Sequence, residues 1–258
     1  MLKVVKIGGN IVDNPEKLER FLCDFARMEG DKILVHGGGK VATTVSKALG
    51  IETTMIAGRR VTDADTLRVV TMVYAGLINK TIVGKLMGYG LRAVGLSGAD
   101  GGFITSRRRA AAPVDYGYVG DPVAVNCDLA AALMEKGYTL VAAPITYDGE
   151  GGMLNTNADT VASTLATALA GAGHRVELVY CFEKPGVLTD VNDDSTLIRE
   201  ITPASYRELK ACGAVADGML PKLDNAFRAI GCGVESVVIC SAERIAVPGY
   251  GGTRLCRG

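Results

Sequence analysis

The stretch Val4-Val5-Lys6-Ile7-Gly8-Gly9-Asn10 decides how this chain folds. A short apolar strand contains a lysine and is followed by two glycines, after which a helix begins. Such a strand end presents backbone N–H groups that can face an anion, and the lysine adds a mobile positive charge beside them. We interpret the stretch as one half of a phosphate site, with an ordinary tight turn as the alternative.

A second stretch of the same kind follows at Ile33-Leu34-Val35-His36-Gly37-Gly38-Gly39-Lys40. Two glycine-rich strand ends near the start of one chain favour a site built for phosphate. The pair Gly39-Lys40 is followed by Val41, so the stretch is not a P-loop, and neither a dinucleotide fingerprint nor a nucleophile elbow occurs. We expect His36 to be structural, packing in the core or hydrogen-bonding a turn.

The composition predicts a globular chain with a substantial core. Of its 258 residues, 48% are hydrophobic and 22% are charged, which is enough for one large domain or two lobes. Lys+Arg and Asp+Glu are both 28, so any anion binding must be local, and a nucleic-acid protein is disfavoured. Seven scattered cysteines and two histidines argue against zinc and predict buried free thiols in a reducing cytoplasm.

Neither a signal peptide nor a membrane span is expected, because the chain begins directly with a strand and has no stretch of about 18 apolar residues. These features predict a cytoplasmic protein.

The order of the predicted elements indicates an α/β fold. Strands at 4–7 and 33–35 alternate with helices that begin at Asn14-Pro15 and Lys40, which implies a parallel sheet with right-handed crossovers. A long helix is predicted from 63 to 89, broken near Gly76, and a β-hairpin from 104–109 and 117–123. The hairpin carries Arg107-Arg108-Arg109, either a phosphate clamp or, as we expect, a solvated strand edge.

Three residues are candidates for catalysis: Lys6, Lys222 and Asp159. Phosphoryl transfer needs mainly positioning and neutralisation of charge on the moving group, which lysines and glycine-loop amides supply without a general base. Such a site suits a nucleophile that is already ionised near neutral pH, for example a carboxylate. Asp159 could hold both lysines, or it could simply be a first-turn acid stabilised by its helix dipole.

Five motifs in this order resemble the amino acid kinase family, and the match covers nearly the whole chain: Lys6-Ile7-Gly8-Gly9-Asn10, His36-Gly37-Gly38-Gly39, Gly58-Arg59-Arg60-Val61-Thr62, Asn155-Thr156-Asn157-Ala158-Asp159 and Asp217-Gly218-Met219-Leu220-Pro221-Lys222. The resemblance implies a three-layer α/β/α sandwich around a mainly parallel sheet, with two lobes. Residues 1–173 would bind the acylated amino acid and form a homodimer. Residues 174–258 would bind ATP, which carries Mg²⁺ on its phosphates.

The resemblance also implies a reaction, the transfer of a phosphoryl group from ATP to the γ-carboxylate of N-acetyl-L-glutamate in arginine synthesis. Lys6 and Lys222 would stabilise the moving phosphoryl group, and Asp159 would orient them. The implied substrate-binding residues are Gly38, Gly39, Arg60 and Asn155, with Arg60 on the α-carboxylate. The implied nucleotide-binding residues are Gly8, Gly9, Asn10, Glu183, Lys184, Pro185, Gly186, Val215 and Ala216.

The chain departs from the family pattern at Phe182-Glu183-Lys184-Pro185-Gly186, where Thr or Ser, Asp and Val commonly precede the glycine. Glu183 would then replace the usual aspartate in the adenosine contacts. The chain also starts at its first strand, without the extra helix that joins arginine-inhibited relatives into hexamers. We therefore expect a homodimer without arginine feedback.

Three alternatives stay open. The arginines and tyrosines of the hairpin would also suit N-succinyl-L-glutamate, whose acyl group carries an extra carboxylate. Another kinase of the family, acting on aspartate, glutamate, carbamate or uridylate, is a second alternative. The third is a non-catalytic amino-acid-binding regulator, which would be expected to lack one of the phosphate-facing lysines.

Overall fold

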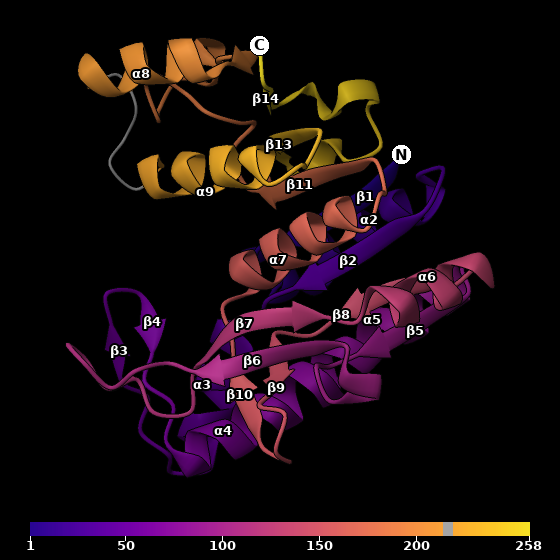
Figure 1. Cartoon of the computed structure of the whole chain (residues 1–258), viewed down its shortest axis with the longest axis vertical. Helices are drawn as coiled ribbons and strands as arrows, with labels where there is room; N and C mark the ends of the chain where they lie inside the picture. Colours follow the sequence, from indigo (N-terminus) through magenta and orange to yellow (C-terminus); the bar gives the residue numbers. More distant parts are fainter. Residues whose placement is uncertain (214–218) are drawn as a thin grey trace.

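The computed structural model describes residues 1–213 and 219–258 of the chain. Within these residues an eight-stranded sheet crosses the molecule in the order β12-β14-β13-β11-β1-β2-β8-β5 (Figure 1). Its strands are β1 (Leu2–Ile7), β2 (Lys32–His36), β5 (Ala93–Leu96), β8 (Thr139–Ala142), β11 (Val176–Phe182), β12 (Glu200–Ile201), β13 (Ser236–Ser241) and β14 (Thr253–Leu255). Neighbouring strands of this sheet run parallel, except that β13 and β14 are antiparallel. The predicted mainly parallel sheet is confirmed.

Helices cover both faces of the sheet, as the three-layer prediction requires. Alternation along β1 sends Val4 to the face covered by α6, α7 and α9, and Val5 to the face covered by α2, α3, α4 and α5. The helices are α1 (Gly9–Val12), α2 (Pro15–Arg27), α3 (Gly39–Ala48), α4 (Ala64–Val70), α5 (Asn79–Gly88), α6 (Cys127–Glu135), α7 (Ala158–Gly171), α8 (Pro203–Ala211) and α9 (Leu220–Gly231). Short 3-10 turns lie at η2 (Asp100–Gly102), η3 (Asp194–Thr196), η4 (Ala242–Arg244) and η5 (Pro248–Gly251).

Helix α2 begins where its sequence signals place it. The Asn14 side chain accepts a hydrogen bond from the Lys17 backbone N–H, and Pro15 occupies the first helical position. The buried residues are Leu18, Phe21, Leu22 and Phe25, spaced along one face of the helix.

The predicted break near Gly76 does not occur. The helix continues from α4 through the π-helix η1 (Thr71–Ile78) into α5, and Gly76 lies inside the π-helical segment. Tertiary packing overrides the weak helix propensity of glycine here, because Val73, Tyr74 and Ile78 bury against the sheet. By length and composition alone, the helical stretch from 64 to 88 could cross a membrane, although its mean hydropathy is only 1.2 and buried core helices share these properties.

The predicted hairpin is confirmed, and it belongs to a second sheet. Strands β6 (Ile104–Arg108) and β7 (Gly120–Val125) are antiparallel, and β6 also pairs with β9 (Ile145–Tyr147), which pairs with β10 (Met153–Asn155). A further small hairpin, β3 (Met55–Ile56) and β4 (Arg59–Arg60), projects near the small sheet in Figure 1.

The large sheet runs across the predicted boundary between residues 173 and 174. Strand β11 pairs with β1 along its length, from Leu2 opposite Val176 to Ile7 opposite Cys181. One hydrophobic cluster likewise contains residues of α7 and α9 together. The division into an amino-acid lobe and an ATP lobe stays a prediction about ligands, since the two segments share one sheet.

The prediction of buried free thiols holds for two of the cysteines. The thiols of Cys181 and Cys240 are buried, whereas Cys212 and Cys232 are exposed, and the other three lie between these extremes. All seven are free. The prediction failed for the exposed pair because both follow directly on the end of a helix, at the surface.

Candidate active site

The candidate site lies at the carboxyl ends of the central strands, where β1, β2 and β11 stop side by side. In open α/β sheets ligands bind in the crevice at this edge. Helix α3 starts here within the second glycine stretch, at Gly39, and α7 starts nearby at Ala158. The two glycine stretches approach closely, since a side chain at Gly37 would contact the Gly9 backbone nitrogen at 3.6 Å.

Two lysines and one aspartate meet at this edge, as the sequence predicts. Lys6 Nζ lies 2.7 Å from Asp159 Oδ1, and the lysine side chain is only 8% exposed. Lys222 Nζ lies 3.9 Å from the centre of the Phe182 ring, and Lys6 Nζ lies 5.3 Å from the same centre. Two ammonium groups, one from β1 and one from α9, thus lie against the same aromatic ring.

Burial and neighbouring charges set the electrostatics of Lys222. Burial lowers the pKa of this lysine below its ordinary value, the Asp159 carboxylate acts to raise it, and the Lys6 ammonium lowers it further. The lysine ammonium is therefore less strongly hydrated than a surface lysine and sits next to a second positive charge. An anion placed between the two lysines would stabilise both.

A cavity of about 880 Å³ opens above these residues. Its lining includes most of the residues predicted to bind the nucleotide or to catalyse, namely Lys6, Gly8, Gly9, Asn10, Glu183, Lys184, Gly186 and Lys222. Its positive charges come from Lys6, Lys40, Lys184 and Lys222, together with Arg60. The whole chain has no net charge, so this excess is local, as predicted.

A smaller cavity of about 250 Å³ adjoins the first and shares Lys6, Gly9, Gly39 and Arg60 with it. It adds the remaining predicted substrate and catalytic residues: Gly38, Asn155 and Asp159. Most residues of the two predicted groups thus line two compartments that meet at Lys6 and Arg60.

Arg60 is a buried cation at the junction of the two cavities. It is 8% exposed, and its guanidinium donates to Gly39 O at 2.9 Å, to Thr43 Oγ1 at 2.9 Å and to Thr53 Oγ1 at 3.2 Å. Within residues 1–213 and 219–258 no carboxylate lies within ion-pair distance of it. Because a buried charge is costly unless it is paired, this arrangement points to an anionic ligand.

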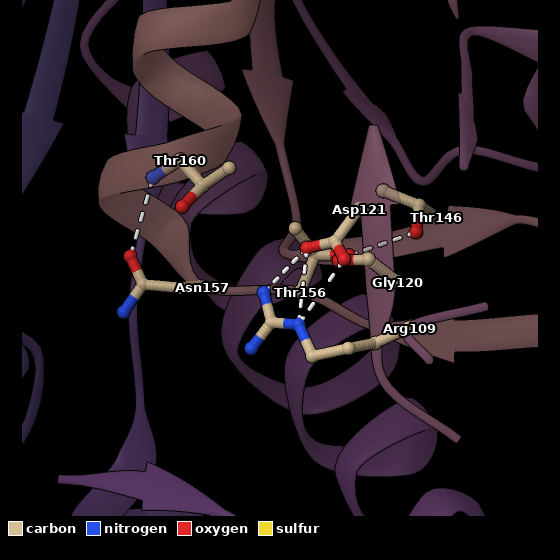
Figure 2. A network of polar contacts seen from close by, with 7 residues as sticks. All are labelled: Arg109, Gly120, Asp121, Thr146, Thr156, Asn157 and Thr160. Atoms are coloured by element: carbon tan, nitrogen blue, oxygen red, sulfur yellow. Dashed lines mark hydrogen bonds and ion pairs between the residues drawn. The ribbon is translucent and has the colours of Figure 1, made fainter. Parts of the chain in front are cut away.

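The wall of the smaller cavity comes from the small sheet and the start of α7. Asn155 donates to Thr62 Oγ1 at 3.0 Å, and its backbone N–H donates to Tyr118 O. Figure 2 shows Arg109 paired with Asp121, and Arg109 lines this cavity together with Thr156 and Asn157. Arg109 is half-buried and lines this cavity, whereas Arg107 and Arg108 are exposed. Two of the three arginines are therefore exposed to solvent, as expected, but their strand is not an edge, because β6 lies between β9 and β7.

Glu183 has defined partners although it departs from the family pattern. It accepts hydrogen bonds from Asn10 Nδ2 at 2.9 Å and from Lys17 Nζ at 3.2 Å. Both hydrogen bonds lower the pKa of the Glu183 carboxyl, and the bond from Asn10 has the larger effect. The carboxyl is therefore ionised near neutral pH. Its longer stem lets Glu183 bridge the first glycine stretch to α2.

Three predicted nucleotide-binding residues are not placed in either cavity. Pro185 is buried beside the larger cavity but does not line it. Val215 and Ala216 lie outside the described residues.

Two charged residues of the larger cavity were missed from the sequence. Lys40 lines it at the start of α3, and its place directly after three glycines was the available signal. Asp13 lines it with both carboxylate oxygens buried and, among the described residues, without a hydrogen-bond partner. Burial raises the pKa of Asp13, and no sequence pattern indicated this.

Comparisons with known proteins agree with this geometry. The model of the amino acid kinase family matches residues 1–241. A protein from Cytophaga hutchinsonii described as acetylglutamate kinase is 56% identical over 245 residues, covering 95% of this chain and 92% of the relative. The acetylglutamate kinase of Bacteroides thetaiotaomicron is 52% identical over 254 residues, covering 98% of each.

A solved structure of similar fold is N-acetylglutamate synthase from Neisseria gonorrhoeae, in complex with coenzyme A and N-acetyl-glutamate. Its TM-score is 0.82 at 19% identity, and the match covers 100% of this chain and 59% of that one. At this identity the likeness concerns the fold alone.

The contacts of Lys222 generate a prediction about its pKa. Replacing Asp159→Asn removes the carboxylate that raises this pKa, so the Lys222 pKa should fall further below the ordinary value. An NMR titration of the lysine side chains measures it. Asp128→Asn is the control, because Asp128 holds the same first-turn position in α6. A Lys222 pKa that is unchanged or higher in the Asp159 variant would contradict the arrangement.

Proposed function

The chain belongs to the amino acid kinase family, and from that premise we propose that it phosphorylates the γ-carboxylate of N-acetyl-L-glutamate with ATP. The products are N-acetyl-L-glutamyl 5-phosphate and ADP, in arginine biosynthesis. Relatives described as acetylglutamate kinases, above 50% identical over nearly the full chain, support this reaction.

The observation that carries the proposal is the buried Arg60 between the two cavities. A guanidinium has five N–H groups, and in Arg60 both Nη2–H groups and one Nη1–H already donate to neighbouring oxygens. The buried positive charge is not paired with a carboxylate of the described residues, so an anionic ligand that reaches the Nε–H or the other Nη1–H would compensate it. We assign the substrate α-carboxylate to Arg60 and the acylated amide to Asn155, which lines the same small cavity.

The larger cavity is proposed to hold ATP. Lys184, Gly186, Glu183 and the first glycine stretch line it, on the side that β11 and α9 provide. No group of three or more His, Cys, Asp or Glu side chains in the described part of the chain could hold a metal ion. We propose that Mg²⁺ is bound with ATP, on its phosphates, where it neutralises part of their charge.

The proposed reaction is a direct displacement at phosphorus. One oxygen of the substrate γ-carboxylate attacks the γ-phosphorus of ATP, and the bond from that phosphorus to the β,γ-bridging oxygen breaks, releasing ADP. A glutamyl γ-carboxyl is ionised at neutral pH, so no general base is needed. Lys6 and Lys222 approach the moving phosphoryl group from β1 and α9, and Asp159 keeps the Lys6 ammonium in place.

A regulator without activity is less well supported. Such a protein would be expected to lack a phosphate-facing lysine, yet Lys6 and Lys222 both line the larger cavity.

The assembly we propose is a homodimer in the cytoplasm. The exposed side chains Met72, Leu77 and Met87 of the long helix offer it an apolar surface.

N-succinyl-L-glutamate is a second candidate substrate because of Arg109. Its guanidinium lines the same small cavity as Arg60 and Asn155, and a succinyl group carries a carboxylate that an arginine can bind. The Asp121 carboxylate already occupies this guanidinium in part. Succinyl binding would therefore require Arg109 to share its donors between Asp121 and the ligand.

Variants of Arg60 test the assignment of the α-carboxylate. We expect Arg60→Lys to raise the KM for N-acetyl-L-glutamate about 10-fold and Arg60→Ala about 100-fold, since charged hydrogen bonds contribute about 1.5–3 kcal/mol each. The KM for ATP should change by no more than about 2-fold. Acyl phosphate formation is measured by trapping the product with hydroxylamine. Arg68→Ala is the control, because Arg68 is exposed and pairs only with Asp65 among the described residues. An unchanged KM for the acylated amino acid in both Arg60 variants would refute the assignment.

Variants of the hairpin arginines decide between the two acyl groups. If Arg109 binds the succinyl carboxylate, Arg109→Ala should lower kcat/KM for N-succinyl-L-glutamate about 30-fold and leave N-acetyl-L-glutamate within about 3-fold. Arg107→Ala and Arg108→Ala are controls from the end of β6, directly before Arg109, and their side chains are exposed. Equal effects of Arg109→Ala on the two substrates would remove the case for the succinyl compound.

A further inference from the structure

His36 is a fully buried histidine at the end of β2, directly before the three glycines. Its Nδ1 lies 2.9 Å from Gly37 O, and its Nε2 lies 3.2 Å from Asn79 Nδ2. Asn79 is also buried and stands at the start of α5, 43 residues further along the chain. Both ring nitrogens thus have one protein partner each.

The partners of Asn79 determine where the imidazole carries its proton. Asn79 Nδ2 also donates to Val141 O at 2.9 Å, and Asn79 Oδ1 accepts from Lys80 Nζ at 3.2 Å. The amide nitrogen therefore faces the ring, and His36 Nε2 must accept its hydrogen bond. A neutral imidazole that accepts at Nε2 carries its proton on Nδ1, so Nδ1–H donates to Gly37 O. Burial lowers the pKa of His36 to about 4, which keeps the ring neutral near pH 7.

The bond to Gly37 O fixes the direction of the next N–H group. The peptide bond between Gly37 and Gly38 is trans, since the described residues contain a single cis bond, at Ala112-Pro113. In a trans peptide the C=O and the following N–H point in opposite directions. With its carbonyl held against the buried ring, the peptide must direct the Gly38 N–H away from the core. This N–H donates to no acceptor among residues 1–213 and 219–258, and Gly38 lines the smaller cavity.

The π-helix η1 packs against one side of the Gly37–Gly38 segment. A side chain at Gly38 would meet Ile78 Cδ1 at 2.1 Å and Tyr74 Cδ1 at 3.3 Å, so the π-helix closes that side. Gly38 also has a φ of 152°, a backbone conformation that is strained for any residue with a Cβ. Two glycines in succession can rotate their shared peptide easily, and the histidine bond is the contact that opposes this rotation.

We propose that His36 is a positioning residue whose Nδ1–H holds the Gly37 carbonyl and thereby aims the Gly38 N–H at the substrate γ-carboxylate. The inference rests on the proposed function for the identity of that carboxylate. His36 itself touches neither substrate nor nucleotide. Asn79 acts one step further away, because it holds the ring in the tautomer that donates to Gly37 O.

Two substitutions at one position separate this role from simple packing. In His36→Asn the amide nitrogen takes the place of Nδ1 and can still donate to Gly37 O. In His36→Leu that donor is absent. Both variants lose the imidazole Nε2 that accepts from Asn79. Asparagine and leucine are similar in size, and only the asparagine amide keeps a donor for Gly37 O.

We expect His36→Leu to lower kcat about 100-fold, the loss typical for one preorganised N–H donor. The KM for ATP should stay within about 2-fold, and His36→Asn should recover kcat to within about 5-fold of the wild type. Melting temperatures of both variants verify folding. Equal kcat values in the two variants would overturn the proposal, because a packing role does not distinguish them.

A second measurement uses the wild type and needs neither turnover nor a variant. The chain has two histidines, His36 and the exposed His174, so nitrogen NMR resolves the tautomer of each. His36 should carry its proton on Nδ1, and a proton on Nε2 would overturn the proposal. A wild type that leaves N-acetyl-L-glutamate unphosphorylated would instead refute the proposed function, and the tautomer result would still stand.

Discussion

The ion pair between Lys6 and Asp159 joins the first strand to the start of α7, and the rest of the site is arranged around it. A buried lysine at a strand end is unfavourable without a nearby carboxylate. Asp159 meets this need only because α7 crosses the sheet face at the level where β1 stops. The same carboxylate acts to raise the pKa of Lys222, and the ammonium groups of Lys6 and Lys222, from β1 and α9, both lie against the ring of Phe182.

The parallel sheet explains why both glycine stretches lie in one place. Strands β1 and β2 are adjacent and in register, with Ile7 opposite His36, so the residues after each strand meet at the same edge. The large cavity then lies on the β11 side of this edge, and the small cavity lies on the side of the second sheet. Lys6 and Arg60 line both compartments, which is where a phosphoryl group would pass from one ligand to the other.

Local signals in the sequence were sufficient for much of the fold. The cap at Asn14-Pro15, the apolar strands at 4–7 and 33–35, and the hairpin around Arg107 each depend on neighbours within a few residues. The prediction of a break at Gly76 failed because burial of Tyr74 and Ile78 holds the helix together there, which is a tertiary effect.

Contacts between distant segments could not be read from the sequence. The Arg109–Asp121 pair spans the hairpin, and the His36–Asn79 contact spans 43 residues, so each depends on how elements pack. Asp13 is a similar case, because its burial results from the approach of α1 to α3. The lysines and glycines of the site were identifiable because their residue types, at strand ends, already indicate phosphate chemistry. Asp159 was identifiable as well, whereas the contact between His36 and Asn79 beside the second glycine stretch carries no such signal.

The central claim is that a substrate carboxylate attacks phosphorus directly between Lys6 and Lys222. The measurement that tests it most directly uses N-acetyl-L-glutamate labelled with ¹⁸O in its γ-carboxylate, with MgATP, and follows the product by ³¹P NMR. The account predicts an acyl phosphate whose bridging oxygen carries the label. An acyl phosphate with an unlabelled bridge, or consumption of ATP without any acyl phosphate, would contradict it.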